Sequence, residues 1–176
     1  MPKKQRPQSL SAYEDTALDA LDYAILDELQ RDARISIAAL GRAITLSAPS
    51  VAERLQRLRA SGVITGFRAE LDPRALGYPI ASFVRIRPTT GRLHKIPELA
   101  REIPEVVECH RVTGEDCFVL KLHLRSMDEL EGILDRFLVF GQTTTSIIHS
   151  SPVAGRPLPL ATDGARKRGH VTRSSS

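Results

Sequence analysis

The stretch 46–64, with the sequence LSAPSVAERLQRLRASGVI, constrains the fold of this chain more than any other. Val51, Leu55 and Leu58 recur at helical spacing and form one apolar stripe. Ser47 is a favourable N-cap, because its hydroxyl accepts a hydrogen bond from an amide that the first turn leaves unpaired. The stretch therefore predicts a helix with one buried face and with its basic residues mostly off that face.

Two shorter helices are expected before this one. The first begins within 18–23, with Asp19 or Asp22 as its N-cap, and the second covers 37–44 behind the N-cap Ser36. Only a short turn separates the second helix from the third. Two helices joined in this way form the helix-turn-helix pattern, in which the second of the pair enters the major groove of DNA.

A β wing is expected after the third helix. Gly62 suits the left-handed position that follows a helix end, and residues 63–71 read as β structure interrupted at Gly66. The segment 34–68 carries six arginines against the single acid Glu53, and such a basic surface suits phosphate contacts. Taken alone, the third helix would fit a surface helix with solvated arginines equally well.

The first turn of the third helix is the expected point of contact with base edges. Ser47, Ala48 and Ser50 are small, and the Ala48 side chain can meet a thymine methyl group. Capping alone is the alternative role. Arg57 is expected to contact phosphate, whereas Arg54 either reaches DNA or pairs with an acid of the first helix. The expected DNA-binding residues are Arg42, Ser47, Ala48, Pro49, Ser50, Arg54, Arg57 and Arg68.

The second half of the chain predicts the order β-α-β-β-α-β, which is the ferredoxin-like arrangement. The turn 114–116 joins the two middle strands, and Gly141 is expected to end the last helix. The expected elements are a strand at 80–87, a helix at 92–103, strands at 106–113 and 117–125, a helix at 127–140 and a strand at 142–149. The fold class is therefore α+β, with an N-terminal winged helix-turn-helix and a C-terminal ferredoxin-like domain.

Changes in composition mark the expected boundaries. Two prolines and a glycine within 73–79 interrupt both periodicities, and the two ends of the chain show no apolar pattern. The expected organisation is a flexible arm at 1–17, the winged helix-turn-helix at 18–71, a linker at 72–79, the ferredoxin-like domain at 80–154 and a disordered basic tail at 155–176.

The two faces of the expected sheet have different partners. Phe118, Leu120, Leu122 and Leu124 alternate along one strand and are expected to meet the two helices. Two helices cover only one face of an open sheet. The opposite face is expected to hold Ala81, Phe83, Cys109, Cys117 and Val119, and a second copy of the chain is the simplest partner for it.

Metal and enzyme chemistry are not expected. Cys109 and Cys117 would lie roughly 13 Å apart along the hairpin, too far for a shared metal ion or a disulfide. His110 and His123 lie on different strands, and no acid is placed to orient either ring. The chain has no GxGxxG, Walker or HExxH motif, so we expect no cofactor.

Composition also bears on location. An apolar content of 41% suits a soluble globular protein. No apolar run reaches the length of about 18 residues that would span a bilayer, and the charged N-terminus lacks the apolar core of a secretory signal. A cytoplasmic protein without disulfides and without a membrane partner is therefore expected.

Together these segments resemble the Lrp/AsnC family of bacterial and archaeal transcription regulators, from about Leu18 to Val153. Many relatives have glycine where this chain has Thr45, and threonine disfavours positive φ. The matching residues are Leu21-Asp22, Ile25-Leu26, Asp32-Ala33-Arg34, Leu46-Ser47, Val51, Arg54-Leu55, Leu58, Gly62-Val63-Ile64, Val112 to Phe118 and Gly141 to Ile147. The resemblance implies an effector-binding, dimerising second domain, assembly of dimers to a tetramer or octamer, and a response to an amino acid or a related small metabolite.

The resemblance also implies a role for the turn 114–116. Composition alone favours a hairpin turn chosen for its conformation. The resemblance instead implies that the turn helps to form the effector pocket, where its amides could hold a carboxylate and Asp116 an α-amino group. The expected effector residues are Thr113, Gly114, Glu115, Asp116, Thr143, Thr144 and Ser146. We therefore expect a sequence-specific DNA-binding regulator that responds to a small molecule; the alternative is a metabolite-binding oligomeric module that acts through protein contacts.

Overall fold

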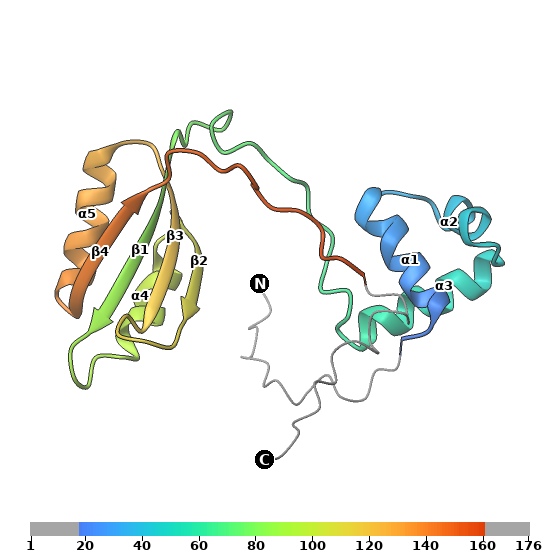
Figure 1. Ribbon diagram of the computed structural model, residues 1–176, viewed down its shortest axis with the longest axis horizontal. Helices are drawn as coiled ribbons and strands as arrows, with labels where there is room; N and C mark the ends of the chain where they lie inside the picture. Colours follow the sequence, from blue (N-terminus) through green and yellow to red (C-terminus); the bar gives the residue numbers. More distant parts are fainter. Residues whose placement is uncertain (1–17, 161–176) are drawn as a thin grey trace, which may run out of the picture. The chain divides into compact units, whose positions relative to one another are not determined.

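The computed structural model describes residues 18–160, which form two compact units (Figure 1). The first unit contains residues 18–69 and 155–160 of the described chain, and the second contains Glu70–Ala154. The expected arm at 1–17 and the part of the expected basic tail beyond residue 160 lie outside the described residues. No helix within 18–160 is long and apolar enough to cross a membrane.

Three helices make up the first unit: α1 (Ala20–Arg31), α2 (Ile37–Ile44) and α3 (Ala48–Ala60). Their N-caps are Asp19, Ser36 and Ser47, as expected from the sequence. Both candidates for the first cap take part, because the Asp19 carboxylate accepts from the Asp22 amide and the Asp22 carboxylate accepts from the Asp19 amide. The fully buried core of this unit is Ile25, Leu40, Val51 and Leu58.

The turn between α2 and α3 is tight. Thr45 adopts the left-handed conformation with φ 59°, and the Leu46 amide donates to the Gly41 carbonyl over 2.8 Å. A Cβ atom on Gly41 would lie 2.6 Å from the Leu46 carbonyl oxygen. Gly41 thus has no room for a side chain. Thr45 adopts the left-handed conformation, which glycine would adopt without strain.

The expected wing is not formed. Residues 61–79 contain turns and irregular backbone but no strand. Val63 and Ile64 pack against the helical core instead, and the Ile64 amide donates to the Leu58 carbonyl. A strand needs a neighbouring strand for its backbone hydrogen bonds, and the described part of the first unit offers none. Arg68 therefore lies on an exposed irregular segment.

The second unit confirms the β-α-β-β-α-β order. Its elements are β1 (Ile80–Pro88), α4 (Lys95–Glu102), β2 (Val106–Arg111), β3 (Phe118–Leu124), α5 (Met127–Leu138) and β4 (Gly141–Ile147). The sheet order is β2-β3-β1-β4 with antiparallel neighbours. Both helices pack on one face of the sheet (Figure 1). The described elements begin or end one to three residues inside several of the expected ranges.

The buried face of the sheet agrees with the alternation in the sequence. Phe118, Leu120, Leu122 and Leu124 are buried in one core with residues of α4 and α5. Gly141 differs from the expectation, because it opens β4 and does not end α5. A Cβ atom there would lie 2.3 Å from the carbonyl oxygen of Arg87, so close contact between β4 and β1 requires glycine.

Cys109 lies on the other face from the one expected. It pairs with Leu120 in the register of β2 and β3, and cross-strand partners share a face, so Cys109 lies on the helix-covered side. A register shift between Val106 and Glu108 and the pairing of the Val112 amide with the Cys117 carbonyl produce this change. A single shifted residue exchanges the two faces of a strand. We refer below to the side of Phe83, Arg85 and Val119 as the open face.

The segment 72–79, expected as a linker, folds onto the second unit. Residues 73–77 form turns, and the Tyr78 amide donates to the Pro73 carbonyl. The Arg125 guanidinium donates to the Tyr78 hydroxyl over 3.1 Å and lies 5.0 Å from the centre of its ring. Because these contacts are local to the second unit, the segment is an ordered extension of β1.

Candidate DNA interface and effector site

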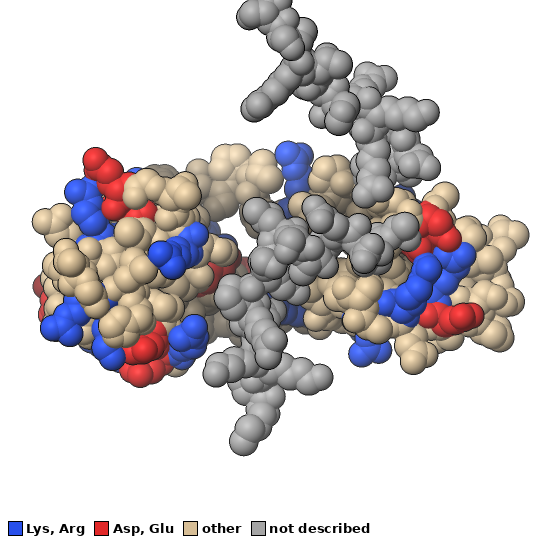
Figure 2. All heavy atoms as spheres, turned by 90° about the horizontal axis from the view of Figure 1, so that it is seen from below, with Lys and Arg blue, Asp and Glu red and all other residues tan. Residues whose placement is uncertain are grey.

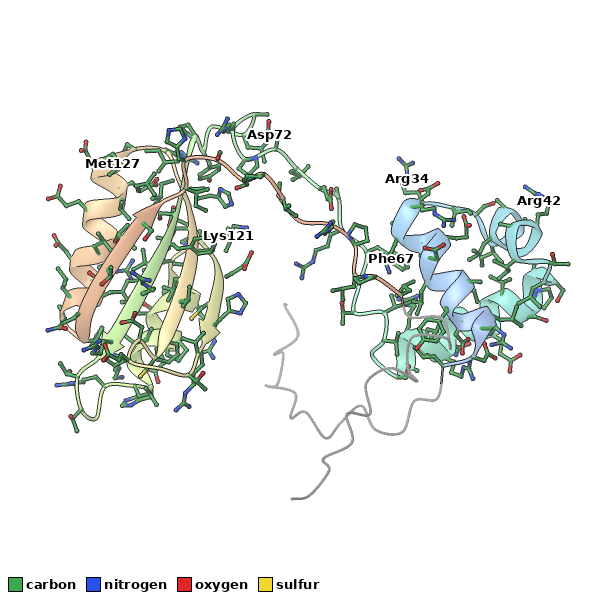
Figure 3. All side chains as sticks on the ribbon, in the orientation of Figure 1. Arg34, Arg42, Phe67, Asp72, Lys121 and Met127 are labelled. Atoms are coloured by element: carbon green, nitrogen blue, oxygen red, sulfur yellow. The ribbon has the colours of Figure 1, made fainter. Side chains whose placement is uncertain are left out.

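The first turn of α3 presents small side chains to solvent. Ala48 and Pro49 are exposed and Ser50 is half-buried. The Ser47 hydroxyl accepts from the Ser50 amide, and the two hydroxyl oxygens lie 2.8 Å apart. Arg42 is exposed on the neighbouring α2 and extends away from the core (Figure 3). The first unit therefore presents a helix terminus with small side chains, and an arginine for which the described residues provide no ion-pair partner.

Arg54 and Arg57 have partners inside the protein. The Nη1 atom of Arg54 lies 2.7 Å from Asp19 and 2.9 Å from Asp22, so the sequence-based alternative of a pair with α1 is the one observed. The Nη2 atom of Arg57 lies 2.6 Å from both oxygens of Asp22. Basic and acidic side chains also lie next to each other on the face of this unit that Figure 2 shows.

Hydrogen bonds stabilise the charged form of Asp19. The Asp22 amide and then the Arg54 guanidinium lower the pKa of the Asp19 carboxyl below its ordinary value. In turn, the carboxylates of Asp19 and Asp22 raise the pKa of Arg54. Asp19 therefore remains ionised while it caps α1 and pairs with α3.

The turn between β2 and β3 lies beside two arginines of β1 on the open face. Gly114 has φ +112°, a conformation that favours glycine. The Asp116 carboxylate lies 3.6 Å from the Arg85 Nε atom, and Glu115 forms an ion pair with Arg87. Sequence reasoning missed both arginines, although they alternate with the buried residues of β1 and follow Phe83 on the same face.

The threonine-rich strand β4 divides between the two faces. Thr144 pairs with Arg85 and Ser146 pairs with Phe83, which places both on the open face. Thr143 pairs with the buried Ile86 and so belongs to the helix-covered side. The structure thus brings Asp116, Arg85 and Thr144 together and separates Thr143 from them. Thr113 and Glu115 are exposed in the turn.

A pocket of about 270 Å³ lies elsewhere on the second unit, between the segment 71–78 and the sheet. Leu76, Tyr78, Val107 and His123 contribute to its wall. Burial, and secondarily Lys121, lowers the pKa of His123, and its Nδ1 atom is buried without a hydrogen-bond partner among the described residues. None of the expected effector residues lines this pocket.

Two family models match the chain. The AsnC-type helix-turn-helix domain matches residues 18–59, and the Lrp/AsnC ligand binding domain matches residues 81–158. The chain is 32% identical over 133 residues to the transcriptional regulator LrpC of Bacillus subtilis, covering 76% of this chain and 92% of that protein. It is 34% identical over 121 residues to the regulator LrpA of Mycobacterium tuberculosis, covering 68% and 81%.

Solved structures give the same result. The structure of B. subtilis LrpC has a TM-score of 0.75 at 31% identity and covers 80% of this chain and 100% of that one. The structure of E. coli AsnC has a TM-score of 0.73 at 27% identity and covers 81% and 99%. With both domain models matched in order and most of each relative covered, the chain belongs to the Lrp/AsnC family of DNA-binding transcriptional regulators, which are not enzymes.

Proposed function

We propose that this regulator reads DNA with the first turn of α3 and binds an amino acid or a related small metabolite beside the turn 113–116. In this proposal residues 18–71 serve DNA binding and residues 80–154 serve effector binding and assembly. The observation that carries the DNA part is the exposed first turn of α3, whose small side chains leave its backbone accessible. Arg42, exposed on α2, adds a positive charge to the same unit.

Base contacts are assigned to Ser47, Ala48, Pro49 and Ser50. A helix with small residues in its first turn can approach base edges closely, and a serine hydroxyl can both donate and accept there. Phosphate contacts are assigned to Arg42, Arg57 and Arg68, all of which are exposed. Arg54 is assigned a supporting role, because its guanidinium is largely enclosed by Asp19 and Asp22.

The effector site rests on the group formed by Asp116, Arg85 and Thr144. A carboxylate and a guanidinium held close together can bind the ammonium and carboxylate groups of an amino acid, with exposed amides near Gly114 as further donors. Thr113, Glu115 and Ser146 border this group, and Thr143 is left out because it lies on the other face. A regulator of the same fold from Neisseria meningitidis was solved as a complex with L-Met.

A homodimer through the open face is the third part of the proposal, with tetramers or octamers built from such dimers. Phe83 is 41% exposed at the centre of a face that no helix of the described chain covers. Burying apolar surface of this kind against a second copy removes it from water. The group at Asp116 would then lie at the edge of the dimer interface.

Two measurements test the proposal. Binding to duplex DNA should weaken steeply as salt rises, and Arg42→Gln should lower the slope of log affinity against log salt by about one. Ser50→Ala should change the preferred sequence more than the slope. In a thermal-shift screen of amino acids, a true effector raises the melting temperature because it binds only the native state. An unchanged slope in Arg42→Gln would contradict its proposed phosphate contact. A screen in which no amino acid shifts the melting temperature would contradict the proposed effector class.

A further inference from the structure

We infer that Asp22 is a positioning residue for DNA binding: it holds the Arg57 guanidinium, and with it the recognition helix α3, in the orientation that meets a DNA phosphate. The inference rests on the proposed phosphate contact of Arg57. It adds a residue of α1, remote in sequence from the recognition helix and inaccessible to DNA, to the DNA-binding machinery.

The Asp22 carboxylate is completely buried and fully hydrogen-bonded. It accepts from the Asp19 amide over 3.1 Å, from Arg54 Nη1 over 2.9 Å and from Arg57 Nη2 over 2.6 Å at each of its oxygens. A buried carboxylate is costly unless it is paired in this way. The carboxylate therefore constrains both arginines strongly.

The two arginines lie on adjacent turns of α3. Residues three apart share a helix face, so Arg54 and Arg57 reach the same carboxylate only when that face of α3 is turned toward α1. Rotation of α3 about its axis would break both contacts together. Within the described residues, the apolar core of this unit consists of four fully buried side chains with partly buried ones around them. Apolar contacts of this kind define the rotation less sharply than charged hydrogen bonds of fixed direction.

Arg57 differs from Arg54 in what it leaves exposed. Its side chain is 53% exposed, whereas that of Arg54 is 24% exposed. Among the described residues, Nη2 is the only atom of the Arg57 side chain with a hydrogen-bond partner, so Nε and Nη1 keep their donors for another acceptor. A guanidinium held on one side by a buried carboxylate is preorganised, and it loses less entropy when a phosphate binds the other side.

The experiment is a double-mutant cycle in the full chain with Asp22→Asn, Arg57→Gln and the double variant. The probe is a duplex that the wild-type protein selects from a random-sequence library, and affinities are measured across a salt series at a temperature where circular dichroism shows every variant folded. Asp27→Asn is the matched control, because it removes a carboxylate from α1 whose one ion pair within residues 18–160 is with the exposed Arg31.

The expected results follow from the geometry. Arg57→Gln lowers the salt slope by about one. Asp22→Asn weakens binding about tenfold relative to the Asp27→Asn control and leaves the slope unchanged, because the phosphate-facing charge remains. In the Arg57→Gln background, Asp22→Asn weakens binding less than it does in the wild type, because only its contact with Arg54 then still orients α3. If Asp22→Asn does not fold, Arg57→Lys replaces it, and weaker binding with the wild-type slope is expected.

Three outcomes separate the alternatives. If Arg57→Gln leaves affinity and slope unchanged, the proposed phosphate contact itself fails. If that contact holds but Asp22→Asn weakens binding equally in both backgrounds, Asp22 serves only the fold and the positioning role is overturned. If Asp22→Asn strengthens binding and steepens the slope, Asp22 withholds Arg57 from DNA, and the positioning role is overturned. Wild-type affinity in Arg57→Lys would also overturn the positioning role.

Discussion

The Nε atom of Arg85, in the middle of β1, lies 3.6 Å from the Oδ2 atom of Asp116, at the end of the turn between β2 and β3. The pair is long for a charge-assisted hydrogen bond, and both side chains are partly exposed. In the proposed effector site, a ligand with an ammonium and a carboxylate group would replace this contact without breaking a strong internal one.

Asp116→Asn should weaken the response to the effector and leave basal DNA affinity unchanged, because α3 belongs to the other unit. The loss of one charged partner predicts about a tenfold rise in the effector concentration for half response. DNA titrations with and without the best compound from the thermal-shift screen measure it. Glu98→Gln is the control, since Glu98 is an exposed carboxylate of α4 that pairs with Lys95. A full wild-type response in Asp116→Asn would return the turn to a conformational role.

Phe83→Arg should dissociate the dimer. The substitution places a charge at the centre of the open face, where a second copy would have to bury it unpaired. Light scattering should then report a mass near the 19.4 kDa of one chain. Leu138→Arg is the control, because Leu138 is 53% exposed on α5, on the helical side of the sheet. A wild-type chain that is a stable monomer at micromolar concentration would contradict the proposed interface.

Gly141→Ala should destabilise the second unit. The added methyl group would lie 2.3 Å from the Arg87 carbonyl oxygen and 2.7 Å from the Pro88 Cα atom, both of which are backbone atoms. Overpacking of this kind costs about 1–3 kcal/mol in the free energy of unfolding. Gly132→Ala is the opposite case: Gly132 lies inside α5 with nothing near its Cβ position, and helix propensity predicts a gain of about 1 kcal/mol. Urea unfolding of both variants measures the contrast, and equal stabilities would show that β4 can move away from β1.

Thr45→Gly should stabilise the first unit. Thr45 has φ 59°, a conformation that costs a residue with a Cβ atom about 1–2 kcal/mol. Glycine removes this strain, and the greater entropy of glycine in the unfolded chain offsets part of the gain. The melting temperature of the helical unit is the measurement, and Thr65→Gly, on irregular backbone without positive φ, should lower it slightly. A lower melting temperature for Thr45→Gly would mean that contacts of the threonine side chain outweigh the strain.

The helices and the buried face of the sheet could be predicted from the sequence because their causes are local. Ser36 and Ser47 cap helices through amides three residues away. Phe118, Leu120, Leu122 and Leu124 recur at every second position, which places them on one face wherever the strand lies. The expected wing failed for the complementary reason: apolar residues and a suitable composition at 63–71 do not make a strand without a partner.

The remaining features depend on contacts between residues far apart in the chain. The register shift between Val106 and Glu108 decides on which face Cys109 lies, and no residue in this segment predicts that shift. Arg57 meets Asp22 across 35 positions, and Arg85 meets Asp116 only because β1 lies beside β3. The sequence by itself thus determined the three helices of the first unit, the order of the elements in the second unit and the family. Tertiary packing decided which charges meet, because the free energy of an ion pair depends on distance and burial, which only the folded chain defines.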